Sequence, residues 1–445
     1  MDGNRPVELK SLSRDWIVGV DASSFIKRTT RWIERMEQKP SGPLLLATAD
    51  PVEFSVVFMA AVLTERPLVL GNPNWGKLEW AEVTSQIKPA IVVCEKALET
   101  FNEATSLPAG AILIPTGGST GAGVVRFACH DWQSLSAAVT GWAAFLGDGV
   151  KQLVCLLPLY HVSGLMQLVR SFHLGIALDF VEGVKSKAFK ESLSSGAVIS
   201  LVATQLDRIL KEPELLTALK GTKAVFVGGG PLRMETAEAA RDLGLPLVLS
   251  YGMTETAAMI TALPAREFLG GAFNAGLPLG NTRLSILDAE GRVCELGTAG
   301  RIQIECPSLF HGFHKNSSST PKTGTYLSDD KGFLDDAGYL HILGRSDYKI
   351  NSGGEKIDPH QIETVLLEEE AISAALVVGQ PDPVWVEQVV LFYVSPQELN
   401  IKELLSGKLS GHKVPKLSIR VPELPLNLQG KIDWVQVRHL VQVYL

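Results

Sequence analysis

Short, uniformly apolar runs recur along the first 250 residues, separated by longer stretches with helical periodicity. Leu44–Ala47 and Leu68–Leu70 are two such runs, and residues 52–63 between them carry a helical pattern. The rhythm returns with apolar runs at residues 112–114, 153–157, 198–202, 224–227 and 247–249, and helical patterns at 132–145 and 234–243. Strands of this kind are usually buried on both faces, in parallel sheets covered by helices. The sequence therefore predicts an α/β fold.

The pattern changes twice in the second half of the chain. After about residue 275, shorter alternating stretches such as 282–287 and Gly300–Glu305 predict a small β unit that extends to residue 344. Beyond Gly344 we expect helices at 359–369 and 396–405 and strands at 374–378 and 389–394. The predicted organisation is a large N-terminal domain, residues 1–344, and a small α+β C-terminal domain, residues 345–445.

Composition narrows the class of partner. The 41 Lys and Arg against 48 Asp and Glu give a net charge of −7 without a long run of either sign, so nothing indicates binding to nucleic acid or to an anionic membrane. The 5 cysteines form no CxxC pair, which favours reduced, buried thiols over disulfides or structural zinc. The longest apolar stretch, residues 56–63, is far short of the ~20 residues of a membrane span, and the N-terminus lacks an apolar targeting region. We expect a cytoplasmic protein that binds small molecules.

Residues 115–121, PTGGSTG, directly follow an apolar run. Glycines let backbone amides approach an anion, and hydroxyls add donors for phosphate oxygens. An ordinary surface loop is the alternative, and a Walker A loop is excluded because its Lys is missing.

Two further motifs follow predicted strands. The run Gly228, Gly229, Gly230 allows a flat ring or a phosphate to lie against the backbone, with a tight turn as the alternative. Residues 250–256, SYGMTET, place Glu255 at the carboxyl end of a strand, where open α/β sheets bind ligands. A carboxylate there suits Mg²⁺ beside a phosphate, although a helix N-terminus with its acid is equally compatible.

Polar residues also gather where the domain pattern changes. Asp330 is suited to accept hydrogen bonds from ribose hydroxyls, Arg345 to bind phosphate or ribose oxygens, and the polar link after Gly344 to swivel. Near the C-terminus, Lys431 is a cation on a flexible stem. The alternatives are a charged turn and a solvated lysine.

The order of these motifs, namely the Gly/Ser/Thr loop, the glycine run, YGMTE, GRSDYKINSGGEKI and GK, resembles the ANL superfamily of adenylate-forming enzymes over essentially the whole chain. The resemblance implies a catalytic Lys431 on a mobile C-terminal domain, a hinge at Asp347, a CoA channel at Gly353 and Gly354, and Glu255 as ligand of Mg²⁺. It also implies an ATP site made of Thr116, Gly117, Gly118, Ser119, Thr120, Gly121, Gly228, Gly229, Gly230, Tyr251, Gly252, Thr254, Asp330 and Arg345, with Arg345 also catalytic.

This chain departs from the superfamily pattern at two places. The usual Tyr-Arg-Thr-Gly-Asp stretch is replaced by YLSDD at residues 326–330, so Asp330 is assigned by counting back from Gly338. The Lys expected late in the phosphate loop falls near Val124, and Arg126 is the candidate for its charge.

Four stretches are similar to the o-succinylbenzoate-CoA ligases of menaquinone and phylloquinone biosynthesis, particularly the cyanobacterial and plastid type: NPNWGKLEW (72–80), RFACHDW (126–132), LPLYHVSGLMQ (157–167) and VGGGPL (227–232). The resemblance implies AMP-forming ligation of 2-succinylbenzoate to CoA with ATP and Mg²⁺. It also implies an acyl pocket lined by His161, Ser163, Gly164, Gln167 and Arg170. Arg170 is suited to pair with the second carboxylate, unless it lies on the outer face of its helix.

Two other readings stay open at this point. One is an acyl-CoA or aryl-CoA ligase for another carboxylate. The other is a nucleotide-binding regulatory protein on a decayed synthetase scaffold, which the missing phosphate-loop Lys motivates. A dinucleotide-dependent oxidoreductase is disfavoured because no GxGxxG with a downstream acid is present. The oligomeric state is left open.

Overall fold

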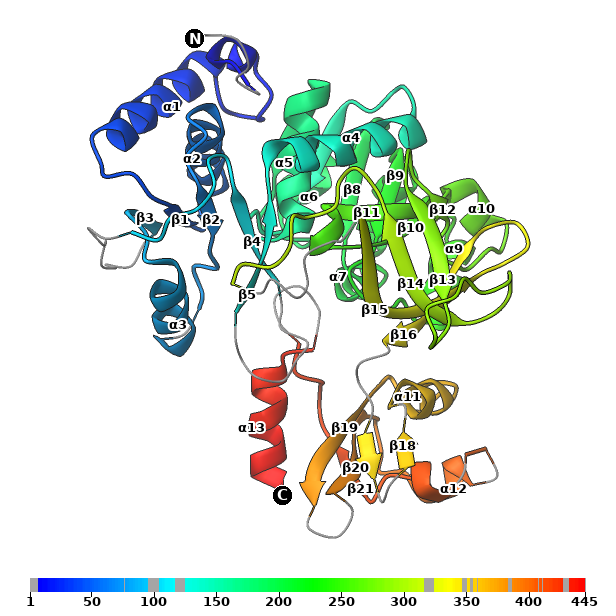
Figure 1. Cartoon of the computed structure of the whole chain (residues 1–445). Coiled ribbons are helices and arrows are strands. Elements are labelled where there is room, and N and C mark those ends of the chain that lie inside the picture. The colour runs from blue at the N-terminus through cyan, green and yellow to red at the C-terminus, as the bar shows by residue number, and fades with distance from the viewer. Residues whose placement is uncertain are drawn as a thin grey trace.

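The computed structural model describes most of the chain, namely residues 7–75, 77–94, 104–116, 125–315, 324–345, 350–352, 355–357, 359–382, 386–406, 408–409, 411–426 and 432–444. Its strands form four sheets with helices packed around them (Figure 1). Within this part of the chain, none of the helices is both long and apolar enough to cross a membrane. All five cysteines are free thiols, of which Cys155 and Cys306 are buried.

The first sheet is almost entirely parallel. Its strand order is β3-β1-β2-β4-β5, and only β5 runs antiparallel to its neighbour. The strands are β1 (Leu44–Ala47), β2 (Leu68–Leu70), β3 (Ile91–Cys94), β4 (Ile112–Thr116) and β5 (Arg126–His130). The helical segments before and between them are η1 (Leu9–Leu12), α1 (Ala22–Glu37), α2 (Pro51–Leu63) and α3 (Lys77–Ile87).

The second sheet has seven strands in the order β12-β11-β10-β9-β8-β6-β7. Its five strands from β10 to β7 are parallel, as predicted for β6, β8, β9 and β10 from their apolar runs, while β11 is antiparallel to both neighbours. These strands are β6 (Gln152–Cys155), β7 (Ala177–Phe180), β8 (Ala197–Leu201), β9 (Ala224–Val227), β10 (Leu247–Met253), β11 (Ala258–Leu263) and β12 (Leu277–Pro278). The helices are α4 (Trp132–Leu146), α5 (Val162–Leu174), α6 (Lys187–Ser192), α7 (Ala203–Ile209), α8 (Pro213–Lys220), α9 (Met234–Asp242), η2 (Thr254–Thr256) and α10 (Ala265–Leu269).

The third sheet is the predicted small β unit. It is antiparallel throughout, with β13 (Arg283–Leu287), β14 (Gly300–Glu305), β15 (Thr325–Leu334) and β16 (Leu340–Arg345) in sequence order. Every strand pairs with the next one along the chain, which agrees with the alternating pattern and Gly-containing turns of this region.

The fourth sheet belongs wholly to the last hundred residues and confirms the α+β character expected there (Figure 1). Its strands are β17 (Ile350–Ser352), β18 (Glu355–Ile357), β19 (Ala374–Asp382), β20 (Val386–Val394) and β21 (Leu417–Arg420). The helices are α11 (Pro359–Leu367), α12 (Ile401–Leu405), η4 (Gly411–Lys413) and α13 (Trp434–Tyr444). The boundary between residues 344 and 345 and the hinge at Asp347 stay predictions, since Asp347 lies outside the described residues.

One predicted helix begins five residues later than expected, and the helix predicted at 359–369 ends at Leu367. Instead of spanning 396–405, α12 begins only at Ile401. The Asn400 side chain caps it by accepting a hydrogen bond from the Glu403 backbone N–H, 3.3 Å away. Just before the helix, the Leu399 N–H donates a hydrogen bond to the Tyr393 hydroxyl. A local cap and a tertiary contact thus override the helical pattern of the sequence.

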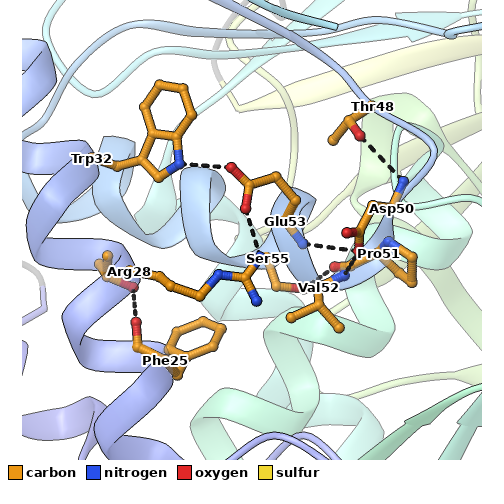
Figure 2. Close-up of polar contacts among 10 residues, drawn as sticks. Phe25, Arg28, Trp32, Thr48, Asp50, Pro51, Val52, Glu53 and Ser55 are labelled. Carbon is orange, nitrogen blue, oxygen red and sulfur yellow. Dashed lines mark hydrogen bonds and ion pairs between the residues drawn. The ribbon is translucent and has the colours of Figure 1, made fainter. Parts of the chain in front are cut away.

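A half-buried carboxylate joins α1 to α2 (Figure 2). Glu53 accepts hydrogen bonds from the Trp32 indole N–H at 2.7 Å and from the Arg28 guanidinium at 2.6 Å. Its own backbone N–H donates to the N-cap Asp50, which fixes the first turn of α2. The next ten residues of α2 are buried, so this acid stands where the helix leaves solvent and enters the core.

Glu53→Ala is expected to lower the free energy of unfolding by about 1–3 kcal/mol, because the indole N–H and the guanidinium lose their shared acceptor. Glu34→Ala, on an exposed position of α1, is the control and should change stability by less than about 0.5 kcal/mol. Urea unfolding of both variants provides the measurement. Equal losses would show that the contact across α1 and α2 contributes nothing of its own.

Candidate active site

The glycine run and the YGMTE motif lie side by side at one edge of the second sheet. Because β9 and β10 are parallel neighbours with Val227 opposite Leu249, the glycine run begins beside Ser250, while β10 continues to Met253. A Cβ on Gly228 would lie 2.7 Å from the Ser250 Oγ and 3.1 Å from the Ser250 carbonyl oxygen, so glycine lets the two segments approach closely. Gly229 has a φ of +82°, which also favours glycine. The arrangement matches the ligand-binding edge of open α/β sheets.

Tyr251 and Asp330, both predicted for nucleotide binding, are in direct contact. The Tyr251 hydroxyl donates to the Asp330 Oδ2 at 2.7 Å. Burial and then the neighbouring carboxylate raise the pKa of Tyr251, so the phenol stays protonated and acts as donor. Asp330 pairs in register with Arg345 across β15 and β16. The small β unit thereby carries two predicted residues to the end of β10.

Glu255 sits on the short turn η2, and this turn is held by three hydrogen bonds from outside. The carbonyl oxygens of Thr254, Glu255 and Thr256 accept, respectively, from His130 Nε2 at 2.7 Å, the Phe310 N–H at 2.8 Å and the Ser308 hydroxyl at 2.9 Å. The next two residues, Ala257 and Ala258, have φ angles of +52° and +75°. Non-glycine residues adopt such angles at a cost of about 1–3 kcal/mol each, so the surroundings must enforce the turn.

The half-buried Glu255 fits a magnesium ion by its donor chemistry. Mg²⁺ prefers hard oxygen ligands and is usually bound through one or two carboxylates together with waters and substrate phosphates. The described part of the chain contains no cluster of three or more His, Cys, Asp or Glu side chains that would hold a metal without help. A single carboxylate beside a nucleotide is therefore the arrangement that these residues offer.

His130 and Ser308 are residues of the site that the sequence did not identify. His130 is fully buried at the end of β5, and desolvation lowers its pKa to about 4. It is therefore neutral at neutral pH. The RFACHDW stretch had been noted only for its similarity, since a buried histidine carries no signal of its partner in the sequence.

The predicted phosphate loop begins where β4 ends. Thr116 is half-buried and pairs in register with Arg126 at the start of β5. The Arg126 guanidinium carbon lies 3.9 Å from the centroid of the Phe313 ring, and its buried Nε has no hydrogen-bond partner within the described residues. Its role as the missing loop cation stays a prediction. The remaining loop residues Gly117, Gly118, Ser119, Thr120 and Gly121 lie outside the described residues, as do Asp347, Gly353, Gly354 and Lys431.

Helix α5 carries two buried polar side chains on the face predicted for the acyl pocket. Gln167 and Arg170 are each 1 % exposed, so the alternative that Arg170 lies on the outer face of the helix is wrong. Both amide atoms of Gln167, and the Nε and one terminal nitrogen of Arg170, have no hydrogen-bond partner among the described residues. The Arg170 guanidinium carbon lies 5.1 Å from the Trp142 ring centroid. Desolvation lowers the pKa of Arg170 to about 9, which leaves it charged at neutral pH.

The other predicted pocket residues lie at the start of α5. His161 is its N-cap residue, with its ring centroid 4.4 Å from that of Tyr160, and Ser163 is half-buried. Gly164 has a packing role: a Cβ there would lie 2.2 Å from the Pro158 carbonyl oxygen. The missing side chain lets α5 approach the turn that follows β6.

Arg170→Met is expected to raise the free energy of unfolding of the ligand-free protein by on the order of 1 kcal/mol or more, because it removes an uncompensated buried charge and retains an apolar stem. Thermal and urea unfolding at pH 7 test this. The matched control is Arg208→Met, on the short helix α7, which should be nearly neutral. A clear loss of stability for Arg170→Met would mean that the guanidinium already has a stabilising partner in the free protein.

Comparison with known proteins agrees with this geometry. Residues 64–314 match the model of the AMP-binding enzyme family, and residues 361–431 match that of the AMP-binding enzyme C-terminal domain. A 2-succinylbenzoate–CoA ligase of Listeria monocytogenes is 32% identical over 352 residues, which cover 76% of this chain and 70% of the relative. One of Bacillus cereus is 32% identical over 355 residues, covering 77% and 73%.

Solved structures agree on the fold. An o-succinylbenzoate CoA synthetase of Bacillus subtilis, in complex with its acyl-adenylate intermediate, superposes with a TM-score of 0.80 at 23% identity and 97% coverage of both chains. ATP-bound MatB of Rhodopseudomonas palustris gives 0.82 at 20% identity, covering 99% of this chain and 100% of its own. Two family models match this chain in order, and the two relatives are 32% identical to it over about three quarters of its length. The chain therefore belongs to the AMP-binding enzyme family.

Proposed function

We propose that this protein ligates 2-succinylbenzoate to CoA through an acyl-adenylate, with ATP and Mg²⁺, as a cytoplasmic step of menaquinone or phylloquinone biosynthesis. Membership of the AMP-binding enzyme family supports adenylation, and relatives that are 32% identical are 2-succinylbenzoate–CoA ligases. The choice of a cytoplasmic site follows from the co-substrates, because ATP and CoA are used there.

The observation that carries the choice of acid is the buried Arg170 with Gln167 one turn before it. A guanidinium that is 1 % exposed, with two nitrogens that lack partners in the described residues, is complementary to an anion that arrives with the ligand. The proposed substrate has two carboxylates. One is activated, and the other, on the aromatic ring, is free to form a planar paired contact with arginine. A plain fatty acid would leave the buried charge uncompensated.

The chemistry needs a leaving group, because a carboxylate is a poor electrophile. The succinyl carboxylate attacks the α-phosphorus of ATP and pyrophosphate leaves, and the CoA thiol then attacks the acyl-adenylate and AMP leaves. Bound at Glu255, Mg²⁺ would offset phosphate charge. Asp330 is assigned to bind the ribose and Tyr251 to line the adenine pocket, and Lys431 is assigned to stabilise the transition state of adenylation.

We further propose that residues 345–445 form a domain that changes its orientation about Asp347 between the two half-reactions. The third sheet ends at Arg345 and the fourth begins at Ile350, so only a short link joins them. Such a movement would exchange Lys431 for the segment of Gly353 and Gly354 at the reacting atoms.

Acid-dependent pyrophosphate release tests the proposed function. We expect release with 2-succinylbenzoate, and thioester formation only when CoA is added. Arg170→Met should raise the KM for this acid about tenfold or more and leave the KM for ATP within about twofold. Benzoylpropionate, which lacks the ring carboxylate, is the matched substrate, and on it the variant and the wild type should be alike. Turnover of a simple fatty acid but not of 2-succinylbenzoate would contradict the choice of acid, and ATP binding without release would favour the regulatory alternative.

Two substitutions should separate the half-reactions. Lys431→Ala should abolish pyrophosphate release yet leave CoA attack on supplied acyl-adenylate largely intact, because the lysine is assigned to one transition state. Asp347→Pro should leave acyl-adenylate formation nearly normal and cause a large loss of thioester formation. Proline fixes φ near −65° and restrains the link in one arrangement, which we expect to be the adenylating one. Quenched assays of each half-reaction provide the measurement. Equal losses in both steps for both variants would argue against a hinge at this residue.

A further inference from the structure

The end of β5 holds a buried imidazole that the reaction above does not use. His130 is 0 % exposed, and both ring nitrogens have partners. Its Nε2 lies 2.7 Å from the Thr254 carbonyl oxygen, and its Nδ1 lies 3.1 Å from the Ser134 Oγ. A carbonyl oxygen can only accept, so the ring proton is on Nε2 and points at the turn that carries Glu255.

The orientation of this ring is set from the other side by the start of α4. With the proton on Nε2, Nδ1 is an acceptor. The Ser134 Oγ lies 3.1 Å from it and 3.0 Å from the Asp131 carbonyl oxygen, so the single hydroxyl proton is shared between two acceptors. The Ser134 Oγ in turn accepts from the Asp131 N–H at 3.1 Å, and the Ser134 N–H donates to the Asp131 carboxylate at 2.7 Å. This reciprocal cap anchors the serine, and through it the imidazole.

The two other contacts of the Glu255 turn come from residues 308–312, which are themselves hydrogen-bonded to β5. Phe310 and Ser308 hold the carbonyls of Glu255 and Thr256. In the same segment, the His311 N–H donates to the Cys129 carbonyl at 2.7 Å, and the Cys129 N–H donates to the Gly312 carbonyl at 2.9 Å. The His311 ring also pairs with the Asp131 carboxylate at 2.9 Å. These three hydrogen bonds to the turn therefore lead back to β5, the strand that follows the predicted phosphate loop.

We propose that His130 is a positioning residue for adenylation, whose Nε2–H holds the Thr254 carbonyl and thereby sets the Glu255 turn relative to the β4–β5 pair that bears the phosphate loop. This inference rests on the proposed function, because it assigns the consequence to the adenylation step. The need for such a support follows from the left-handed φ angles of Ala257 and Ala258, since a strained turn relaxes when an outside contact is removed. A displacement of about 1 Å at a reacting centre is enough to cost on the order of 10²-fold in rate.

The experiment compares His130→Gln with His130→Asn. The Gln amide nitrogen reaches the position of Nε2 and can still donate to the Thr254 carbonyl. The Asn amide reaches only the position of Nδ1, so it retains the contact with Ser134 and loses the turn. We expect His130→Asn to lower kcat for pyrophosphate release about tenfold or more and to raise the Mg²⁺ concentration needed for half-maximal rate. The KM for the acid should stay within about twofold, and His130→Gln should stay within about threefold of wild type throughout.

A second readout needs neither metal nor turnover. Amide hydrogen exchange in the ligand-free protein should become faster over residues 250–258 in His130→Asn but not in His130→Gln, while a peptide over α7 serves as the unchanged reference. His130→Phe, which fills the same space without a donor, should behave as His130→Asn does. If one of these two variants does not fold, the other gives the comparison with His130→Gln.

Equal kinetics and equal exchange in His130→Asn and His130→Gln would overturn the proposal. The proposal would also be overturned if both variants unfolded at the same lowered temperature and their kcat values fell equally, because the loss of rate would then follow from lost stability alone. Failure of the proposed function is distinguishable from failure of this proposal. If the wild type does not turn over 2-succinylbenzoate, the exchange experiment and the kinetics with an acid that it does accept still test the role of His130.

Discussion

Parallel pairing of β9 with β10 brings the carboxyl ends of both strands to one edge of the second sheet, and the glycine run and the YGMTE motif lie along that edge. Gly228 lets the chain that leaves β9 pass close to β10, because a Cβ there would lie 2.7 Å from the Ser250 Oγ. The Glu255 turn, the Tyr251 hydroxyl and the glycine run owe their proximity to it. The other sheets then deliver Asp330 from one side and the start of the phosphate loop from the other.

Two parts of the candidate site are held in states that the chain would not adopt alone. The turn at Thr254–Thr256 leads into two alanines with positive φ, and Arg170 is a buried cation without a full set of partners in the described residues. Both cost folding free energy. Such costs persist at functional sites because the surrounding core supplies the difference. Here α4, α5 and the second sheet belong, together with α2 and the first sheet, to the largest apolar cluster of the described residues.

Much of the fold was predictable because burial leaves a direct record in the sequence. Strands such as Leu44–Ala47 and Ala224–Val227 are buried on both faces and therefore uniformly apolar, and the antiparallel unit of β13 to β16 alternates because it is not. The prediction was wrong for the start of α12, where a helical pattern extends over residues 396–400. A side-chain cap from Asn400 and the hydroxyl of Tyr393 decide that boundary, and neither contact has a periodicity.

For the candidate site, the sequence by itself determined which residue types follow strands, namely the glycines at 228–230 and the acid of YGMTE, and that a cation lies in the predicted acyl-pocket segment. Spacing along one chain contains this information, because a strand followed by polar residues ends at a definite edge. Only the tertiary structure decided that Arg170 is buried, that Tyr251 donates to Asp330, and that a histidine 124 residues before Thr254 holds its carbonyl. Those contacts join segments from different sheets, and hydrogen-bond partners so far apart are chosen by packing in three dimensions.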